Sequence, residues 1–152
     1  MTPRLNAFAA APAPMKSWLD FSQGLKQIGL EESLMELVVI RASQINGCAF
    51  CLDMHTTDAR KRGTTEQRLY LLDAWRDSPL YSDRERAALA WTEALTLLPE
   101  TRAPDDVYEA LKAQFSEEEQ VKLTLMIVAI KGWNRINVGF RAVHPIEQRR
   151  AA

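Results

Sequence analysis

The stretch of residues 31–63 limits the fold of this chain more than any other part of the sequence. Residues 31–45 have a strongly apolar helical pattern that ends at Asn46-Gly47, a pair typical of a helix end followed by a tight turn. A second helix is predicted over residues 48–62, and the glycine that follows it is a common C-terminal signal. The sequence therefore predicts two helices that fold back on each other antiparallel at this turn.

Helical spacing also dominates the rest of the chain. Further helices are predicted over residues 18–28, 65–76, 82–98, 105–115 and 116–140. Ser82 with Glu85, and Ser116 with Glu119, match the capping box that opens a helix. No alternation of apolar and polar residues persists over a strand length, so we expect an all-α fold.

The domain organisation is expected to be simple. A chain of 152 residues has the length of a single domain. Residues 1–16 combine alanines with Pro12 and Pro14, and we expect an extended N-terminal arm that lies across a neighbour or a surface. Residues 17–152 are predicted to form one helical domain.

Composition and charge exclude several classes of protein. The 19 basic residues are scattered among 20 acidic ones, giving a net charge of −1, so a nucleic-acid-binding surface is not indicated. No apolar run approaches the roughly 20 residues that span a bilayer, and the prolines near the start make a poor signal peptide. We therefore expect a cytoplasmic protein, where a CxxC pair is more often catalytic or metal-binding than a lasting structural disulfide.

The only two cysteines of the chain form a compact cluster with a histidine. Cys48 and Cys51 stand three residues apart, and His55 follows one helical turn later. Residues three and four apart share one face of a helix, so these side chains are expected to line one side of it. The free N–H groups and the positive dipole end at a helix N-terminus favour an anion and lower the pKa of a thiol. The pattern predicts a redox-active cysteine pair.

One acid, Glu36, interrupts the apolar run of residues 34–40. Its neighbour one turn later is Ile40, which cannot neutralise it, and an unpaired buried carboxylate costs several kcal/mol. If the two helices fold back antiparallel, Glu36 and His55 lie with an axial offset of roughly 4–5 Å. We therefore predict a proton relay from Glu36 through His55 to Cys51.

Other interpretations of these residues remain open. Zinc would need four ligands, and His144 would have to come in from the far end of the chain. The two cysteines could be inert core residues, His55 a surface histidine, and Glu36 an acid that faces solvent or the rim of an oligomer. A thioredoxin-like motif is disfavoured because no strand is predicted before Cys48.

Residues 36–63, centred on the sequence RASQINGCAFCLDMH at 41–55, resemble the alkylhydroperoxidase AhpD core within the carboxymuconolactone decarboxylase-like family. Residues 85–91 and 133–137 are similar to the small stand-alone members of that group, and the resemblance covers most of residues 18–141. It implies an all-helical AhpD-like fold that assembles into homo-oligomers, commonly trimers or hexamers.

The resemblance also implies a role for each site residue. Cys51 would be the peroxidatic thiol and Cys48 the resolving, more exposed thiol, while His55 and Glu36 would form the proton relay. The well-studied alkylhydroperoxidase pattern has a histidine immediately before the second cysteine, where this chain has Phe50. The difference removes one proton carrier from the site.

The site and the resemblance together predict a thiol-dependent hydroperoxide reductase that needs no bound metal, haem or flavin. Its substrate would be a hydroperoxide, and its reductant an external dithiol such as a lipoyl group on a partner protein. One alternative keeps the site but makes the chain a general disulfide reductase or redox sensor with little peroxidase turnover. Another is a non-redox decarboxylase-type lactone enzyme or a structural oligomer.

Overall fold

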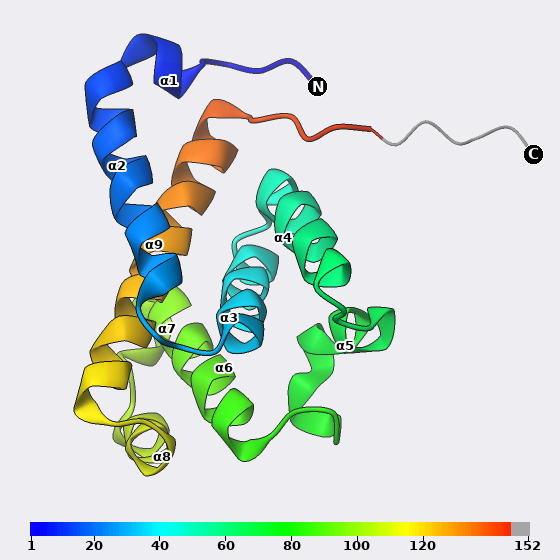
Figure 1. Cartoon of the computed structure of the whole chain (residues 1–152), viewed down its shortest axis with the longest axis vertical. Coiled ribbons are helices and arrows are strands. Elements are labelled where there is room, and N and C mark those ends of the chain that lie inside the picture. Colours follow the sequence, from blue (N-terminus) through cyan, green and yellow to red (C-terminus); the bar gives the residue numbers. More distant parts are fainter. Residues whose placement is uncertain (147–152) are drawn as a thin grey trace, which may run out of the picture.

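The computed structural model describes residues 1–146, and within them the chain is a bundle of helices without strands (Figure 1). The elements follow one another as α1 (Ala7–Ala10), α2 (Pro12–Gly24), the 3-10 turn η1 (Leu25–Gln27), α3 (Glu32–Ile45), α4 (Ala49–Lys61), α5 (Glu66–Tyr70), the 3-10 segment η2 (Leu72–Asp77), α6 (Asp83–Thr96), α7 (Leu98–Thr101), α8 (Asp105–Gln114) and α9 (Glu117–Phe140). The all-α fold predicted from the sequence is confirmed. Over the same residues, no helix has both the length and the apolar character that a membrane crossing requires.

Helix α3 is the centre of the bundle. It packs against α4, α6 and α9, which surround it on three sides (Figure 1). Every residue from position 34 to position 40 is buried, including Val38 and Ile40, which are almost completely hidden. A helix that is apolar on all sides is stable only inside a protein, so its sequence alone requires other helices to cover it.

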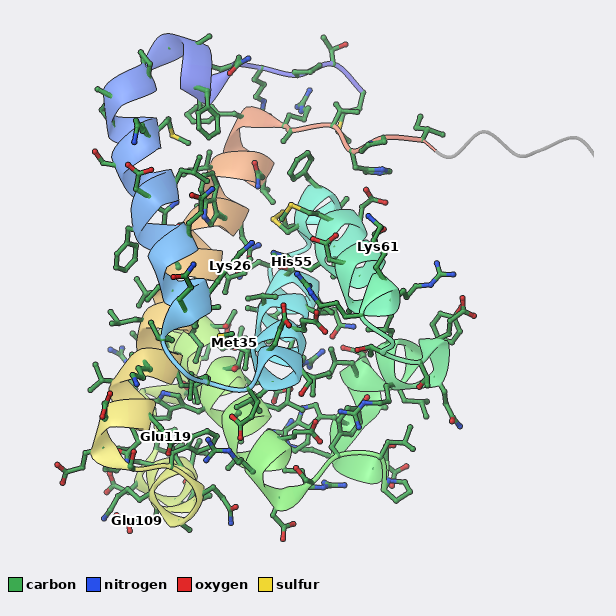
Figure 2. The ribbon with its side chains drawn as sticks, viewed as in Figure 1. Lys26, Met35, His55, Lys61, Glu109 and Glu119 are labelled. Atoms are coloured by element: carbon green, nitrogen blue, oxygen red, sulfur yellow. A yellow bond between two sulfur atoms is a disulfide. The ribbon has the colours of Figure 1, made fainter. Side chains whose placement is uncertain are left out.

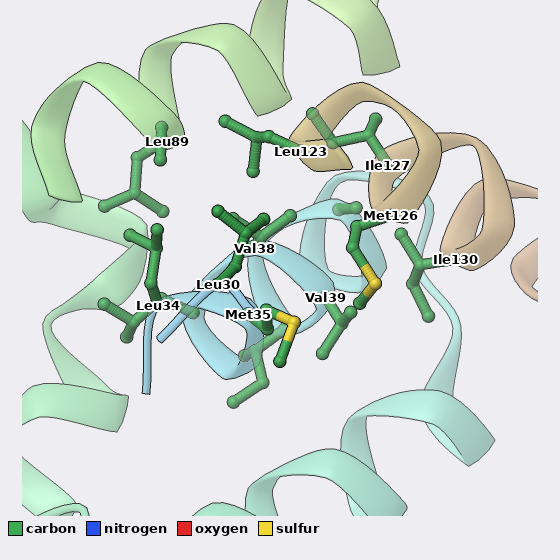
Figure 3. Close-up of a cluster of buried hydrophobic side chains, with 14 of the residues drawn as sticks. Leu30, Leu34, Met35, Val38, Val39, Leu89, Leu123, Met126, Ile127 and Ile130 are labelled. Atoms are coloured by element: carbon green, nitrogen blue, oxygen red, sulfur yellow. The ribbon is translucent and has the colours of Figure 1, made fainter. Parts of the chain in front are cut away.

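The core is made where α3 meets α6 and α9. Val38 and Val39 of α3 lie in the same cluster as Leu89 of α6 and Ile127 and Ile130 of α9 (Figure 3). Burial of these aliphatic side chains contributes about 1.5–3 kcal/mol each. The core therefore fixes the position of α9 against α3.

Both predicted capping boxes are present. The Ser82 hydroxyl accepts from the Glu85 backbone while the Glu85 carboxylate accepts from the Ser82 backbone, and Ser116 and Glu119 repeat this arrangement at the start of α9. α9 then continues to Phe140, where the predicted helix ends.

The prediction of an extended arm over residues 1–16 is wrong for most of its length. Helix α2 begins at Pro12, and Asn6 caps the short α1 by accepting a hydrogen bond from the Ala9 backbone. Both prolines lie in the first turn of α2, where backbone N–H groups have no partner within the helix, so neither proline disrupts a hydrogen bond. Residues 1–6 are not helical.

A second difference concerns residues 65–76, which were predicted to form one helix. The structure has the short α5 followed by η2, with a non-helical Ala74 inside η2. The Trp75 indole donates to Glu93 Oε1 of α6 over 2.8 Å, and Arg41 Nη1 of α3 donates to Asp73 Oδ1. These contacts with α3 and α6 outweigh the local helical preference, which is weak by comparison.

The N-terminal segment and α2 contact α9 at several places. The Arg4 backbone N–H donates to the Phe140 carbonyl over 2.9 Å, at the C-terminal end of α9. Further along, the ring of Trp18 from α2 lies so close to Gly132 of α9 that a methyl group on Gly132 would overlap it. The missing side chain at position 132 therefore lets α2 dock directly on α9.

This close approach predicts that Gly132→Ala destabilises the protein by about 1–3 kcal/mol, because Trp18 must move to make room for the methyl group. The free energy of unfolding in urea measures the effect. Gly139→Ala is the matched control on the same helix, since no atom outside its immediate surroundings lies within 4 Å of a methyl group there. The control is expected to be neutral or stabilising by up to about 1 kcal/mol. Equal effects of both variants would contradict the close approach.

Candidate functional site

The cysteine pair lies where the sequence predicts it, at the N-terminus of the helix that follows the turn. Cys48 is the N-cap of α4, and its sulfur accepts a hydrogen bond from the Cys51 backbone N–H at 3.3 Å. The two residues form a disulfide, drawn as a yellow bond at the start of α4 in Figure 2, with their Cα atoms 5.3 Å apart. This separation lies within the usual range for a disulfide.

A buried polar network holds the turn that leads into the pair. The Asn46 side chain donates to Asn134 Oδ1 on α9 over 2.9 Å, and the Asn134 amide donates to Ser43 Oγ over 3.0 Å. The backbone N–H of Cys48 donates to the Ser43 carbonyl over 3.0 Å. Gly47 has a φ of +63°, which a glycine adopts without strain. The network therefore links α9 to the residue at which α4 begins.

Cys51 opens onto a mostly apolar cavity of about 670 Å³. Its wall comes from the N-terminal segment with Phe8, α2 and η1 with Lys26, α3 with Val39, α4 with Cys51 and His55, and α9 with Trp133. A volume of this size suits a small organic molecule. The segment predicted to be an extended arm thus forms one wall of the cavity beside the disulfide.

The two sulfur atoms differ in their access to this cavity. Cys48 and Cys51 are both only 1% exposed, but only Cys51 belongs to the cavity wall. The family resemblance implies that Cys48 is the more exposed thiol, and the structure does not show this difference. Cys48 is withdrawn because it is the N-cap residue and points its sulfur back at the first turn of α4.

Asn137 of α9 is a sulfur partner that sequence reasoning did not assign. Its Nδ2 atom donates to Cys51 Sγ over 3.4 Å, and Asn137 also lines the cavity. A hydrogen bond to sulfur is stronger when the sulfur is an anion. The signal in the sequence is that Asn134 and Asn137, three residues apart, place two amides on one face of a helix rich in apolar residues.

His55 is partly buried at the same cavity. The pKa of its imidazole is lowered to about 4, mainly by burial and next by the charge of Lys26; Asp58 opposes this shift and Arg62 adds to it. The ring is therefore neutral at pH 7 and able to accept a proton. It lies one turn after Cys51, on the same face of α4.

Glu36 is buried, as its apolar surroundings predict, but it has a different partner from the one expected. Its Oε1 accepts from Arg62 Nη1 over 2.7 Å, and Thr64 donates to Oε2 over 3.4 Å. Arg62 also binds Glu32 one turn earlier on α3, over 2.8 Å. The hydrogen bonds formed among residues 1–146 do not include one between Glu36 and His55.

The physical reason for this difference is the charge of the partner. A guanidinium is always charged and binds a carboxylate through a rigid fork, whereas a partly buried imidazole with a lowered pKa offers no charge. The long side chain of Arg62 also reaches back along α3 from the end of α4. The prediction from the sequence compared only the axial positions of Glu36 and His55 and did not consider this side chain. In the structure Glu36 thus ties the end of α4 to α3.

Within the part of the chain that the structure describes, no group of three or more His, Cys, Asp and Glu side chains could hold a metal ion. His144 hydrogen-bonds to the carbonyl of Pro145 and is half-buried.

The carboxymuconolactone decarboxylase family is described by a sequence model that matches residues 12–94, more than half of the chain. The chain belongs to this family. Its match includes both cysteines, His55 and Glu36. The family resemblance seen in the sequence is confirmed.

Individual relatives agree with this assignment. The uncharacterised protein YdfG of Bacillus subtilis is 46% identical over 138 residues, which span 91% of this chain and 94% of that protein. The crystal structure of ATU0492 from Agrobacterium tumefaciens matches this chain with a TM-score of 0.94 and 47% identity, covering 96% of this chain and all of that one. ATU0492 is a protein of unknown function that is suggested to be the antioxidant defence protein AhpD. The fold is therefore AhpD-like.

A more distant structure shares the fold alone. The debrominase Bmp8 without ligand has a TM-score of 0.83 at 18% identity, covering 91% of this chain and 74% of its own.

The contact between Asn137 and sulfur predicts that Asn137→Leu lowers the reactivity of the reduced Cys51 thiol about tenfold near neutral pH. Loss of the donor raises the thiol pKa, so less thiolate is present. The rate of alkylation by iodoacetamide, followed over pH in a Cys48→Ser background, measures this effect. Gln23→Leu changes another amide of the cavity wall and serves as the control, which is expected to leave the rate within about twofold.

The ion pair between Arg62 and Glu36 leads to a prediction for the pKa of His55 when both of these charges are removed. In the double variant Glu36→Gln/Arg62→Gln, the His55 pKa is expected to rise from about 4, because the guanidinium that lowers it is gone. If Glu36 instead acted on the ring as a relay partner, the same variant would lower the pKa. A proton–carbon NMR titration of the oxidised protein decides between the two, and His144→Gln assigns the signals because the chain has only two histidines. Arg60→Gln, on the same helix but paired with Glu66, is the control.

Proposed function

We propose that this protein is a thiol-dependent reductase of organic hydroperoxides, in which Cys51 attacks the peroxide. The observation that carries the proposal is that one sulfur of the CxxC pair faces an apolar cavity that also contains a neutral imidazole, His55, and the amide of Asn137. A nucleophile, a base and a hydrogen-bond donor thus meet where a small apolar substrate would bind.

In the reduced protein, His55 takes the proton of the Cys51 thiol. The thiolate attacks the distal oxygen of the hydroperoxide, the O–O bond breaks, and the leaving alkoxide takes the proton back from the imidazolium. The products are an alcohol and the Cys51 sulfenic acid. The Cys48 thiol then displaces hydroxide from the sulfenic acid, which gives the disulfide and water.

An external dithiol completes the cycle. It attacks Cys51 Sγ from the cavity, Cys48 leaves as a thiolate, and the second thiol of the reductant then displaces Cys51. A slender dithiol such as a lipoyl arm on a partner protein fits this route. No bound cofactor takes part in any step.

Within this scheme Glu36 is a positioning residue. Through Arg62 it fixes the end of α4 and adjusts the field at His55, rather than passing protons itself. Phe50 belongs to the cavity wall, so the position that carries a histidine in the well-studied pattern contributes apolar surface here.

The setting of this activity follows from its chemistry. A disulfide that is made and broken in each cycle needs a reducing compartment such as the cytoplasm.

We also propose that the protein is a homo-oligomer, since α9 carries exposed apolar side chains such as Val121 and Val128, which are 60% and 49% exposed.

Single-cysteine variants test the proposal. Cys51→Ser is expected to abolish turnover of cumene hydroperoxide with dihydrolipoamide as reductant. Cys48→Ser is expected to consume one equivalent of peroxide per chain and then stall, because no resolving thiol remains. Peroxide consumption and the free thiol count are measured together.

Three results would contradict the proposal. Undiminished steady-state turnover by Cys51→Ser would exclude Cys51 as the nucleophile. Exchange with small disulfides, combined with only stoichiometric peroxide consumption by the wild type, would favour a disulfide reductase or redox sensor. Full function after alkylation of both thiols would place the activity outside redox chemistry.

A further inference from the structure

Lys26 stands out among the residues of the cavity wall because of its charge. It belongs to η1, the turn that ends α2, and its side chain approaches the cavity from the α2 side, opposite His55 on α4 (Figure 2). The wall contains no aspartate, glutamate or arginine among the described residues, so Lys26 is its one permanently charged side chain. The reduction of a hydroperoxide does not by itself require this charge.

Lys26 differs from the other lysines of the chain in its hydrogen-bond partners. The sequence has six lysines, and five of them have an acceptor within the described residues. Lys16 binds Asp20, Lys61 binds Asp58, Lys112 binds Glu109, Lys122 binds Glu118, and Lys131 donates to the Leu95 carbonyl. Over residues 1–146, neither an ion pair nor a side-chain hydrogen bond involves Lys26.

The ammonium of Lys26 is also close enough to act on the catalytic group. Its charge is the second cause, after burial, of the lowered pKa of His55. Cys51 lies one turn before His55 on the same helix, and the cation, the imidazole and the sulfur all line the same cavity. A bound molecule of modest length can touch all three.

We infer that the cavity selects hydroperoxides that carry an anionic group, and that Lys26 binds that group while the apolar wall holds the rest of the molecule. This inference rests on the proposed function and names the substrate class for it. Charge complementarity supports an anion, because a carboxylate would meet one cation and no acid on the wall. The apolar character of the remaining surface supports a substrate whose body is hydrocarbon.

The position of the cation suits this role. A lysine near the C-terminal end of a helix is stabilised by the negative end of the helix dipole. Lys26 is exposed to solvent, and a carboxylate that binds it forms a charge-assisted hydrogen bond. The substrate anion therefore supplies the partner that the protein does not.

A matched pair of peroxides tests the inference. The ratio of kcat/KM for 4-(2-hydroperoxypropan-2-yl)benzoate to kcat/KM for its methyl ester is measured in the wild type and in two variants. We expect the wild type to prefer the carboxylate by about tenfold, which is about 1.4 kcal/mol. Lys26→Met is expected to lose this preference, and Lys26→Arg to keep most of it. Lys16→Met, a lysine of α2 that is paired with Asp20 away from the cavity, is expected to keep the wild-type ratio.

A binding measurement separates this inference from the proposed function. Trp133 lines the cavity, so its fluorescence reports the binding of 4-isopropylbenzoate and its methyl ester, which carry no peroxide. Trp133→Phe identifies the signal. A preference for binding the carboxylate that depends on Lys26 supports the inference even if neither peroxide is turned over. Absence of peroxide turnover would contradict only the proposed peroxidase function. A carboxylate preference that survives in Lys26→Met, or no preference in the wild type, overturns the inference while leaving peroxide turnover as a separate result.

Discussion

A single buried amide determines where the sulfur atoms lie. Asn134 is 1% exposed, and its hydrogen bonds to Asn46 and Ser43 join the longest helix to the turn between α3 and α4. Because a buried amide without partners costs about 1–3 kcal/mol for each lost contact, α9 and the turn can pack stably in only one register. The same register brings Asn137, one turn later, to the sulfur of Cys51. Scaffold and site therefore depend on one stretch of one helix.

The parts of the structure that sequence reasoning anticipated are those determined within a few residues. Both capping boxes and the place of Cys48 at the start of α4 depend on contacts three residues apart, which the sequence displays directly. Glu36 was expected to be buried with a partner, and it is. Its partner is Arg62, a residue 26 positions away, whose reach depends on how α3 and α4 cross rather than on helical spacing. The N-terminal helices were missed because prolines were taken as helix breakers, although the first helical turn tolerates them.

The ion pair between Arg62 and Glu36 also bears on the chemistry of the imidazole of His55, which lies in α4 about two helical turns before Arg62. A carboxylate hydrogen-bonded to His55 would favour the imidazolium, whereas the cations near the ring favour the neutral form. A neutral imidazole can accept the proton of a thiol, and its lowered pKa makes it a weaker base than a free imidazole. In the proposed reaction, the imidazolium would in turn be more acidic than a free imidazolium and would return its proton to the leaving alkoxide.

The cavity would impose an order on the two half-reactions of the proposed cycle. Only Cys51 belongs to its wall, and the N-terminal segment, α2 and α9 enclose the space in front of that sulfur. In the proposed cycle, a peroxide and a dithiol would reach the same atom through the same space, so neither would react while the other is bound. The protein would then store the oxidising equivalents as the Cys48–Cys51 disulfide between the two binding events. The docking of α2 on Gly132, which shapes this space, is thus part of what decides which molecules reach the sulfur.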